Sequence, residues 1–180
     1  MPADTSRSGQ DQGSVCADTD RGVSPPGRLP AQGVAEVVKL EILNDTKNRL
    51  PGKLIRELFD IVARSEADTK WQATVNIIFV NDNRMRRLNK KHRKMNRPTD
   101  VLSFNLDRPE MSDHVFGEVY ISCDTARRQA KEYGVTIIEE YLRLACHGLL
   151  HLFGYDHKKP ADAEKMRTIE QGCLDHVRHS

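Results

Sequence analysis

Four stretches of the chain carry the short apolar runs that are typical of β-strands. Leu40 and Ile42 alternate with polar residues, as in a strand with one buried face. Residues 73–80 are apolar along most of their length, which is typical of a strand in the middle of a sheet. The predicted strands lie within 34–43 and over 73–80, 101–104 and 116–122.

Between and after these strands, apolar residues recur three or four positions apart, which is the spacing of one helix face. Leu54, Leu58 and Ile61 show this spacing in the first predicted helix, over 52–65. Residues suited to helix ends mark the other helices. They are Asn81 or Asp82 and then Asp124 as caps, Gly134 as a stop, Thr136 with Glu139 as a capping box, and Pro160 as a first helical residue.

The nine predicted elements run strand, helix, strand, helix, strand, strand and then three helices. This order predicts an α/β (α+β) fold in a single domain, with a mixed sheet of about four strands covered by helices. Residues 1–34 are rich in Gly, Ser, Pro and Asp and hold few apolar residues. Such a segment cannot bury enough surface to offset the entropy lost on ordering. We therefore predict a disordered extension over 1–34 and a folded domain over 35–180.

Three of the seven histidines fall within eleven residues near the C-terminus. His147 and His151 are four residues apart, so on a helix they lie on one face and can hold one metal ion between them. Gly154 can end that helix, because glycine readily adopts the positive φ required there, and the chain can then return His157 as a third ligand. Three protein ligands with one vacant position are typical of a catalytic zinc, so we expect one Zn²⁺ per chain.

The spacing His-x3-His-x5-His resembles the metal-ligand frame of the metzincin peptidases, so a zincin-like fold is expected. Those peptidases place a Glu directly after the first His as general base, whereas this chain has Gly148 there. A glycine inside a helix costs about 1 kcal/mol relative to Ala. We therefore expect Gly148 to meet a spatial requirement, by leaving room beside the metal for a bulky substrate or for another backbone.

Eight cationic residues and no acidic ones occupy residues 84–97. A solvated helix face usually mixes both signs of charge, so this run favours a phosphate-binding surface and a nucleic-acid partner. The candidate substrate contacts within it are Lys90, Lys91, Lys94 and Arg97.

Composition narrows the class of protein further. The net charge of +2 identifies no partner, and the four cysteines form no CxxC pair, so neither a disulfide framework nor a cysteine zinc site is indicated. Free thiols fit a reducing cytosol. No run approaches the roughly 20 apolar residues that a membrane span needs, and the first residues lack the pattern of a secretory signal. We expect a cytoplasmic protein with no membrane partner.

Several segments together resemble the YbeY family, over about residues 36–177. The resemblance implies a metal-dependent hydrolase: a single-strand-specific, zinc-dependent endoribonuclease. It also implies a role in ribosomal RNA maturation, at the 3′ end of the small-subunit 16S rRNA, and in ribosome quality control. The matching segments are residues 88–93, RPTDVLSF over 97–104, GEVYIS over 117–122 and HGLLHLFGYDH over 147–157.

The same resemblance implies roles for individual residues and partners. The three metal ligands of the family correspond to His147, His151 and His157, and the arginine needed for activity corresponds to Arg93. The implied partners are ribosomal RNA and the small ribosomal subunit, with ribosomal proteins or assembly GTPases as further candidates.

The sequence leaves several alternatives open. Asp156 could accept an N–H from a ligand histidine or could serve the turn beside Gly154. Ser103 could reach the substrate or pack at a strand edge. With Gly148 in place of Glu, the base could be zinc-bound hydroxide, or the 2′-OH of the RNA could be the nucleophile. A non-catalytic ribosome-assembly module with a structural metal and, less favoured, a zinc peptidase are the alternative functions.

Overall fold

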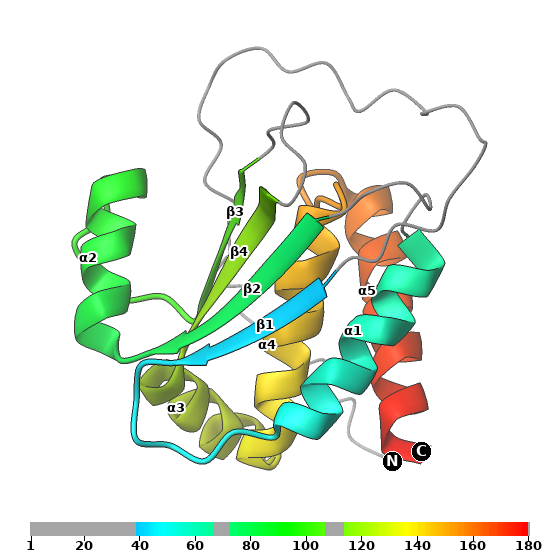
Figure 1. Ribbon diagram of the computed structural model, residues 1–180, viewed down its shortest axis with the longest axis horizontal. Coiled ribbons are helices and arrows are strands. Elements are labelled where there is room, and N and C mark those ends of the chain that lie inside the picture. Colours follow the sequence, from blue (N-terminus) through cyan, green and yellow to red (C-terminus); the bar gives the residue numbers. More distant parts are fainter. Residues whose placement is uncertain (1–38, 67–72, 107–113, 180) are drawn as a thin grey trace, which may run out of the picture.

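The computed structural model describes residues 39–66, 73–106 and 114–179, which form four strands and five helices in the predicted order (Figure 1). The predicted extension over 1–34 lies outside the described residues. The elements are β1 (Lys39–Asn44), α1 (Gly52–Glu66), β2 (Ala73–Val80), α2 (Asp82–Arg93), β3 (Val101–Asn105), β4 (His114–Ser122), α3 (Cys123–Tyr133), α4 (Ile137–Leu152) and α5 (Pro160–His179).

The four strands form one mixed sheet in the order β1-β2-β4-β3. β1 and β4 both run parallel to β2, and β3 lies at the far edge, antiparallel to β4. The parallel strands β2 and β4 lead directly into α2 and α3, so the starts of these two helices meet at one edge of the sheet. The predicted mixed four-stranded α/β fold in a single domain is confirmed.

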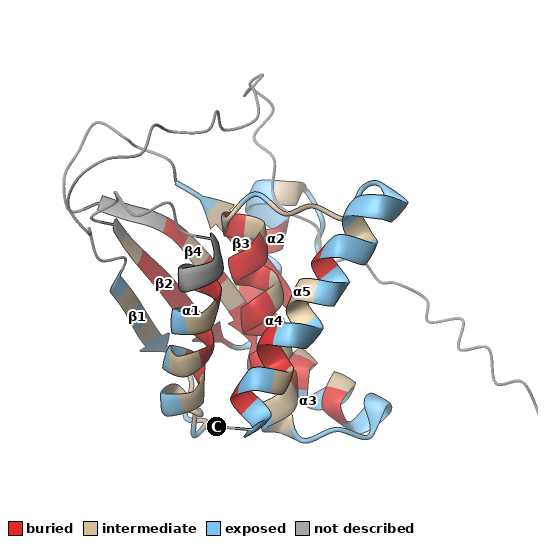
Figure 2. Cartoon of the chain, turned by 90° about the vertical axis from the view of Figure 1, so that its right-hand side faces the viewer, coloured by how far each residue is buried: buried red, intermediate tan, exposed pale blue. Residues whose placement is uncertain are grey.

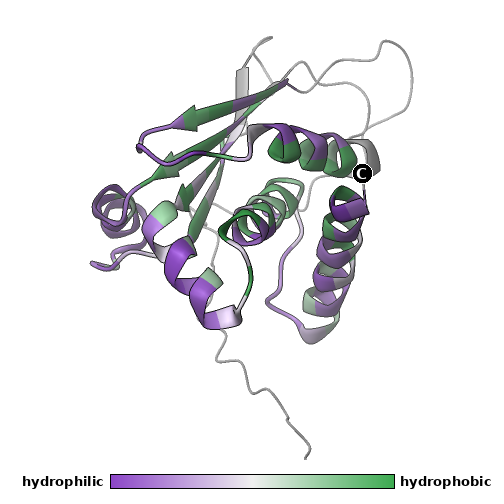
Figure 3. Ribbon diagram, turned by 90° about the horizontal axis from the view of Figure 1, so that it is seen from below, coloured by the Kyte–Doolittle hydropathy of each residue, from purple (hydrophilic) through white to green (hydrophobic). Residues whose placement is uncertain are grey.

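The helices cover the two faces of the sheet unequally. α4 lies against β3 and β4, and α1 and α5 pack on α4 from its other sides (Figure 2). The main core fills this layer, and within it the rings of Phe79 and Tyr141 meet edge to face at 5.1 Å. On the opposite face, α2 covers a smaller cluster that includes Ile78, Met85 and Leu102. Figure 3 shows the apolar sides of α1 and α4 turned inward and the polar surface of α2 turned outward.

α4 is the most deeply buried helix, and Gly148 lets it approach the sheet closely. A Cβ placed on Gly148 would lie 2.4 Å from Val119 Cγ1 and 3.3 Å from Val101 Cγ2. The hydroxyl of Ser103 on β3 donates to the Gly148 carbonyl at 3.1 Å. The expectation that Gly148 leaves room for a substrate is therefore wrong. A side chain at this position would point at the strands, so the glycine serves the close contact between helix and sheet.

The helix ends follow the sequence signals with one exception. Thr136 and Glu139 form the predicted capping box on α4, and Gly134 ends α3 with φ +68°. The predicted cap Asp124 is wrong, because the Ser122 side chain caps α3 instead. Asp124 lies in the first turn of α3, and its carboxylate accepts a hydrogen bond from the backbone N–H of Asp82 on α2.

Asp82 fastens the start of α2 to the start of α3. Its carboxylate accepts hydrogen bonds from Ser122 Oγ at 2.5 Å, Thr125 Oγ1 at 2.8 Å and Arg128 Nη2 at 2.9 Å. Burial alone would raise the pKa of Asp82, but these three donors lower the pKa below its usual value. The network therefore sets how the basic helix α2 sits against α3.

Cys146 is fully buried in the core. Across the described ranges, every helix is too short or too polar to cross a lipid bilayer.

We predict that Gly148→Ala lowers the free energy of unfolding by about 1–3 kcal/mol, because the buried, β-branched Val119 has no room to move away from the added methyl group. Urea denaturation measures this change. Gly172→Ala is the matched control, because a Cβ at this exposed position on α5 meets nothing within 4 Å. The control should raise stability by about 0.5–1 kcal/mol through helix propensity. Equal stabilisation by both variants would contradict the steric account.

We predict that Asp82→Asn lowers the free energy of unfolding at pH 7 by about 1–3 kcal/mol, because the ionised carboxylate is lost from three donors. The folded pKa of Asp82 is depressed, so its contribution to stability is complete above the pKa of an ordinary aspartate and disappears as the pH falls through the folded pKa. Denaturation of both proteins at pH 7 and near pH 3 should show this gap narrowing. Asp60→Asn, an exposed change on α1, should produce no comparable gap at either pH.

Candidate metal centre

α4 places two imidazole rings side by side on the one face of the helix that is only partly buried. His147 and His151 lie one helical turn apart, and their Nε2 atoms are 3.1 Å from each other. Both residues are partly buried, while their neighbours on the helix are packed into the core. The buried face of α4 thus fixes the side on which the two rings stand.

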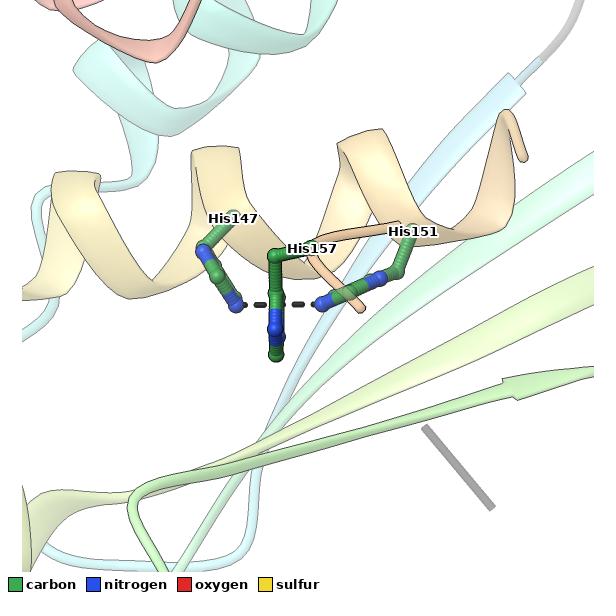
Figure 4. A group of neighbouring side chains, drawn as sticks. All are labelled: His147, His151 and His157. Carbon is green, nitrogen blue, oxygen red and sulfur yellow. Dashed lines mark hydrogen bonds between the residues drawn. The ribbon is translucent and has the colours of Figure 1, made fainter. Parts of the chain in front are cut away.

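The turn after α4 returns a third ring to the same point. Gly154 has φ +89°, as the sequence predicts for a helix stop, and the N–H of Tyr155 donates back to the Leu150 carbonyl. The chain then reverses and brings His157 beside the first two histidines (Figure 4). One ring nitrogen from each of the three residues lies within 4.8 Å of the other two.

The remaining ring nitrogens of the two helical histidines are held by acceptors. His147 Nδ1 lies 3.1 Å from Glu170 Oε2 on α5, and His151 Nδ1 lies 2.8 Å from the Tyr155 carbonyl oxygen. An ionised carboxylate and a carbonyl can only accept, so both Nδ1 atoms carry a proton. In the neutral rings, each Nε2 then bears a lone pair, and the two lone pairs face one another.

Burial keeps one of these rings neutral. It lowers the pKa of His151 to about 4, and the nearby His147 lowers the pKa further, although the Tyr155 carbonyl opposes the shift. At neutral pH, His151 therefore presents an unprotonated Nε2. A neutral imidazole nitrogen is the form that binds a metal ion.

The geometry of the three histidines fits one cation. Nitrogens that are each about 2.0–2.1 Å from a tetrahedral zinc lie about 3.4 Å apart, which is close to the 3.1 Å between His147 and His151. A cation between them would also relieve the repulsion of the facing lone pairs. This group could hold a metal ion, with at least one coordination position left for another ligand.

Glu170 is a residue of this centre that the sequence analysis missed. It lies 23 positions after His147, and only the packing of α5 on α4 brings the two together. The predicted partner, Asp156, is placed differently: its Oδ1 accepts from the backbone N–H of His157 at 2.7 Å, and its Oδ2 pairs with Lys158. Of the two roles considered for Asp156, these contacts favour the one in the turn. Glu170 and the Tyr155 carbonyl hold the Nδ1 atoms of the helical histidines.

The other candidate residues fall into two groups. Ser103 is only 6% exposed and its hydroxyl donates to the Gly148 carbonyl. Of the two roles considered for Ser103, this placement favours packing between strand and helix over contact with the substrate. Arg93, the last residue of α2, is half-buried and lines a cavity of about 480 Å³ between α2, residues 95–100 and α3. The remaining candidates, Lys90, Lys91, Lys94 and Arg97, are exposed around the end of α2.

We predict that Glu170→Gln weakens metal binding about 10–100-fold, because the amide carries no charge to favour the protonated Nδ1 of His147. Competition with a coloured chelator measures the affinity independently of any activity. Asp156→Asn is the matched control, since it also removes one carboxylate charge near the histidines. A larger loss with Asp156→Asn than with Glu170→Gln would reverse the assignment.

Comparisons with known proteins identify the family and support the fold. The sequence model of the family described as Endoribonuclease YbeY matches residues 41–178. Proteins named Endoribonuclease YbeY from Limosilactobacillus reuteri and Desulforamulus reducens are 36% and 39% identical to the chain, over 152 and 131 residues. These alignments cover 76% and 69% of this chain and 95% and 85% of the relatives.

A solved structure shares the fold. The solution structure of a Thermotoga maritima protein superposes with a TM-score of 0.55 at 30% identity, covering 77% of this chain and 88% of that one. The family model spans most of the chain and includes all three histidines and Arg93. This chain belongs to the YbeY endoribonuclease family.

Proposed function

We propose that the protein is a zinc-dependent endoribonuclease that cleaves single-stranded ribosomal RNA. Its proposed task is maturation of the 3′ end of the small-subunit 16S rRNA in the cytoplasm, together with a part in ribosome quality control. Family membership and the relatives' names support the activity on RNA. The small ribosomal subunit, with its RNA and proteins, is then the expected partner, and assembly GTPases remain further candidates.

The observation that carries this proposal is the pair of Nε2 atoms facing each other at 3.1 Å. Their Nδ1 atoms face acceptors, so both Nε2 atoms are placed to bind one cation. A zinc ion held by His147, His151 and His157 would supply a Lewis acid for phosphodiester hydrolysis. Glu170 and the Tyr155 carbonyl keep two of the three rings in the tautomer that this requires.

Arg93 is the proposed phosphate-binding residue. Its planar guanidinium can bind two phosphate oxygens at once and can offset charge that develops during cleavage, which a lysine does less well. The exposed Lys90, Lys91, Lys94 and Arg97 surround it and would attract the RNA backbone. In this proposal the cations hold the strand, and the histidine centre lies where the bond is cut.

The two alternative functions differ in what they require of the site. A ribosome-assembly module would need the metal only for stability, so it would bind RNA without cutting it. A peptidase would need a general base after the first histidine, and Gly148 faces the sheet at that position. Incubating the metal-loaded protein with single-stranded rRNA and with casein separates all three functions.

We predict that Arg93→Ala lowers the rate of RNA cleavage about a hundredfold, because a charge-stabilising donor is lost, while metal content and the unfolding midpoint stay unchanged. Arg93→Lys should recover only part of this loss, since the two-pronged contact is not restored. Gel analysis of a labelled rRNA fragment measures the rate.

Two further variants make this result interpretable. Arg56→Ala removes one exposed arginine from α1, on the side of the molecule away from α2, and should leave cleavage intact. His151→Ala should abolish both metal binding and cleavage. Cleavage that survives His151→Ala would come from a contaminating nuclease, and RNA binding without any cleavage by the unmodified protein would favour the assembly module.

A further inference from the structure

Tyr133 is an exposed aromatic residue with no structural task in the part of the chain described. It is the last residue of α3, and 55% of it is exposed. Within the described residues, its hydroxyl makes no hydrogen bond and its ring meets no other ring. A single exposed tyrosine needs no explanation by itself, so its surroundings decide what it can do.

Tyr133 lies where two hollows meet. The first is the cavity of about 480 Å³ that Arg93 and Arg97 also line. The second, of about 430 Å³, lies between α3, α4 and α5 and includes Glu170, which bonds to the metal-binding ring of His147. A chain molecule that runs from the Arg93 cavity toward the histidines would therefore pass over Tyr133.

The lining of the first cavity suits a nucleobase better than a bare phosphate. Asn89 and Gln129 donate through their amide nitrogens to the Arg97 carbonyl and to Asp100 Oδ2, which fixes the direction of both amides. Within the described residues, neither carbonyl oxygen accepts a hydrogen bond, and the protein covers both atoms. The Asp100 carboxylate beside them would repel a phosphate placed at this point. A base offers N–H donors at its edge and an aromatic face.

The cations at this cavity are placed for the phosphates on either side of such a base. Arg97 is exposed, and within the described residues it pairs with no carboxylate. Arg128 is exposed as well, but it is held by Asp82 and Thr125. The cavity thus combines an aromatic surface with positive charge at its rim, which is the combination used to bind single-stranded nucleic acid.

We propose that this cavity holds one unpaired nucleotide of the RNA, with its base stacked on Tyr133. The inference rests on the proposed ribonuclease function and adds the way the strand is gripped beside the cleavage site. It accounts for a preference for single strands, because a base within a duplex is not free to leave its stack and enter the cavity.

The test uses the full-length, metal-loaded protein and a short single-stranded 2′-O-methyl RNA, which resists cleavage. The RNA carries 2-aminopurine at each position in turn, because the fluorescence of this base falls when it stacks. We expect the unmodified protein to quench one position. Tyr133→Leu should remove that quenching and weaken binding about tenfold, whereas Tyr133→Phe should retain both.

Two controls separate stacking from charge and from general surface change. Arg97→Gln should reduce the slope of log affinity against log salt by about one, while quenching persists once binding is saturated. Leu43→Ala, at another exposed apolar position, on β1, should change neither quantity. An abasic nucleotide at the quenched position should cost the unmodified protein the same tenfold and should cost Tyr133→Leu nothing more.

The outcomes distinguish this inference from the proposed function. If the unmodified protein binds and cleaves RNA but Tyr133→Leu binds it equally tightly with the same quenching, the nucleotide site is wrong and the ribonuclease proposal stands. If the unmodified protein neither binds nor cleaves RNA, the ribonuclease proposal fails, and the nucleotide site fails with it.

Discussion

Two lone-pair nitrogens held face to face at 3.1 Å are the constraint on which the rest of the site depends. Two separate elements maintain this arrangement. α5 contributes Glu170, and the turn after α4 contributes the Tyr155 carbonyl, each holding an Nδ1–H. These two acceptors orient the rings so that both Nε2 atoms face the same point.

The remainder of the fold keeps the basic helix at a fixed place relative to this centre. α3 is the connecting element, because it contacts both α2 and α4. Asp82 ties the start of α2 to α3 through three hydrogen bonds. α4 in turn packs on β3 and β4. The cations near Arg93 and the three histidines are therefore linked through α3, although α2 and α4 lie on opposite faces of the sheet.

Local sequence signals were sufficient for most of this framework. The spacing of His147 and His151, the stop at Gly154 and the capping box at Thr136 each depend on neighbours within a few residues, and each was found. Glu170 was missed because its contact depends on how α5 packs. The wrong cap, Asp124, has a similar cause, since its carboxylate serves α2 and not its own helix. The role of Ser103 depends on α4 lying over it, a contact between residues far apart in the sequence.

The packing at Gly148 also bears on how this family could be related to the metzincin peptidases. From the sequence, a single Gly148→Glu substitution would supply the absent glutamate. In the structure, however, Val119 and Val101 occupy the space that its side chain would need. A glutamate there would force α4 off the sheet and carry both helical histidines with it. Converting this centre into the peptidase arrangement would thus require strands and helix to be remodelled together.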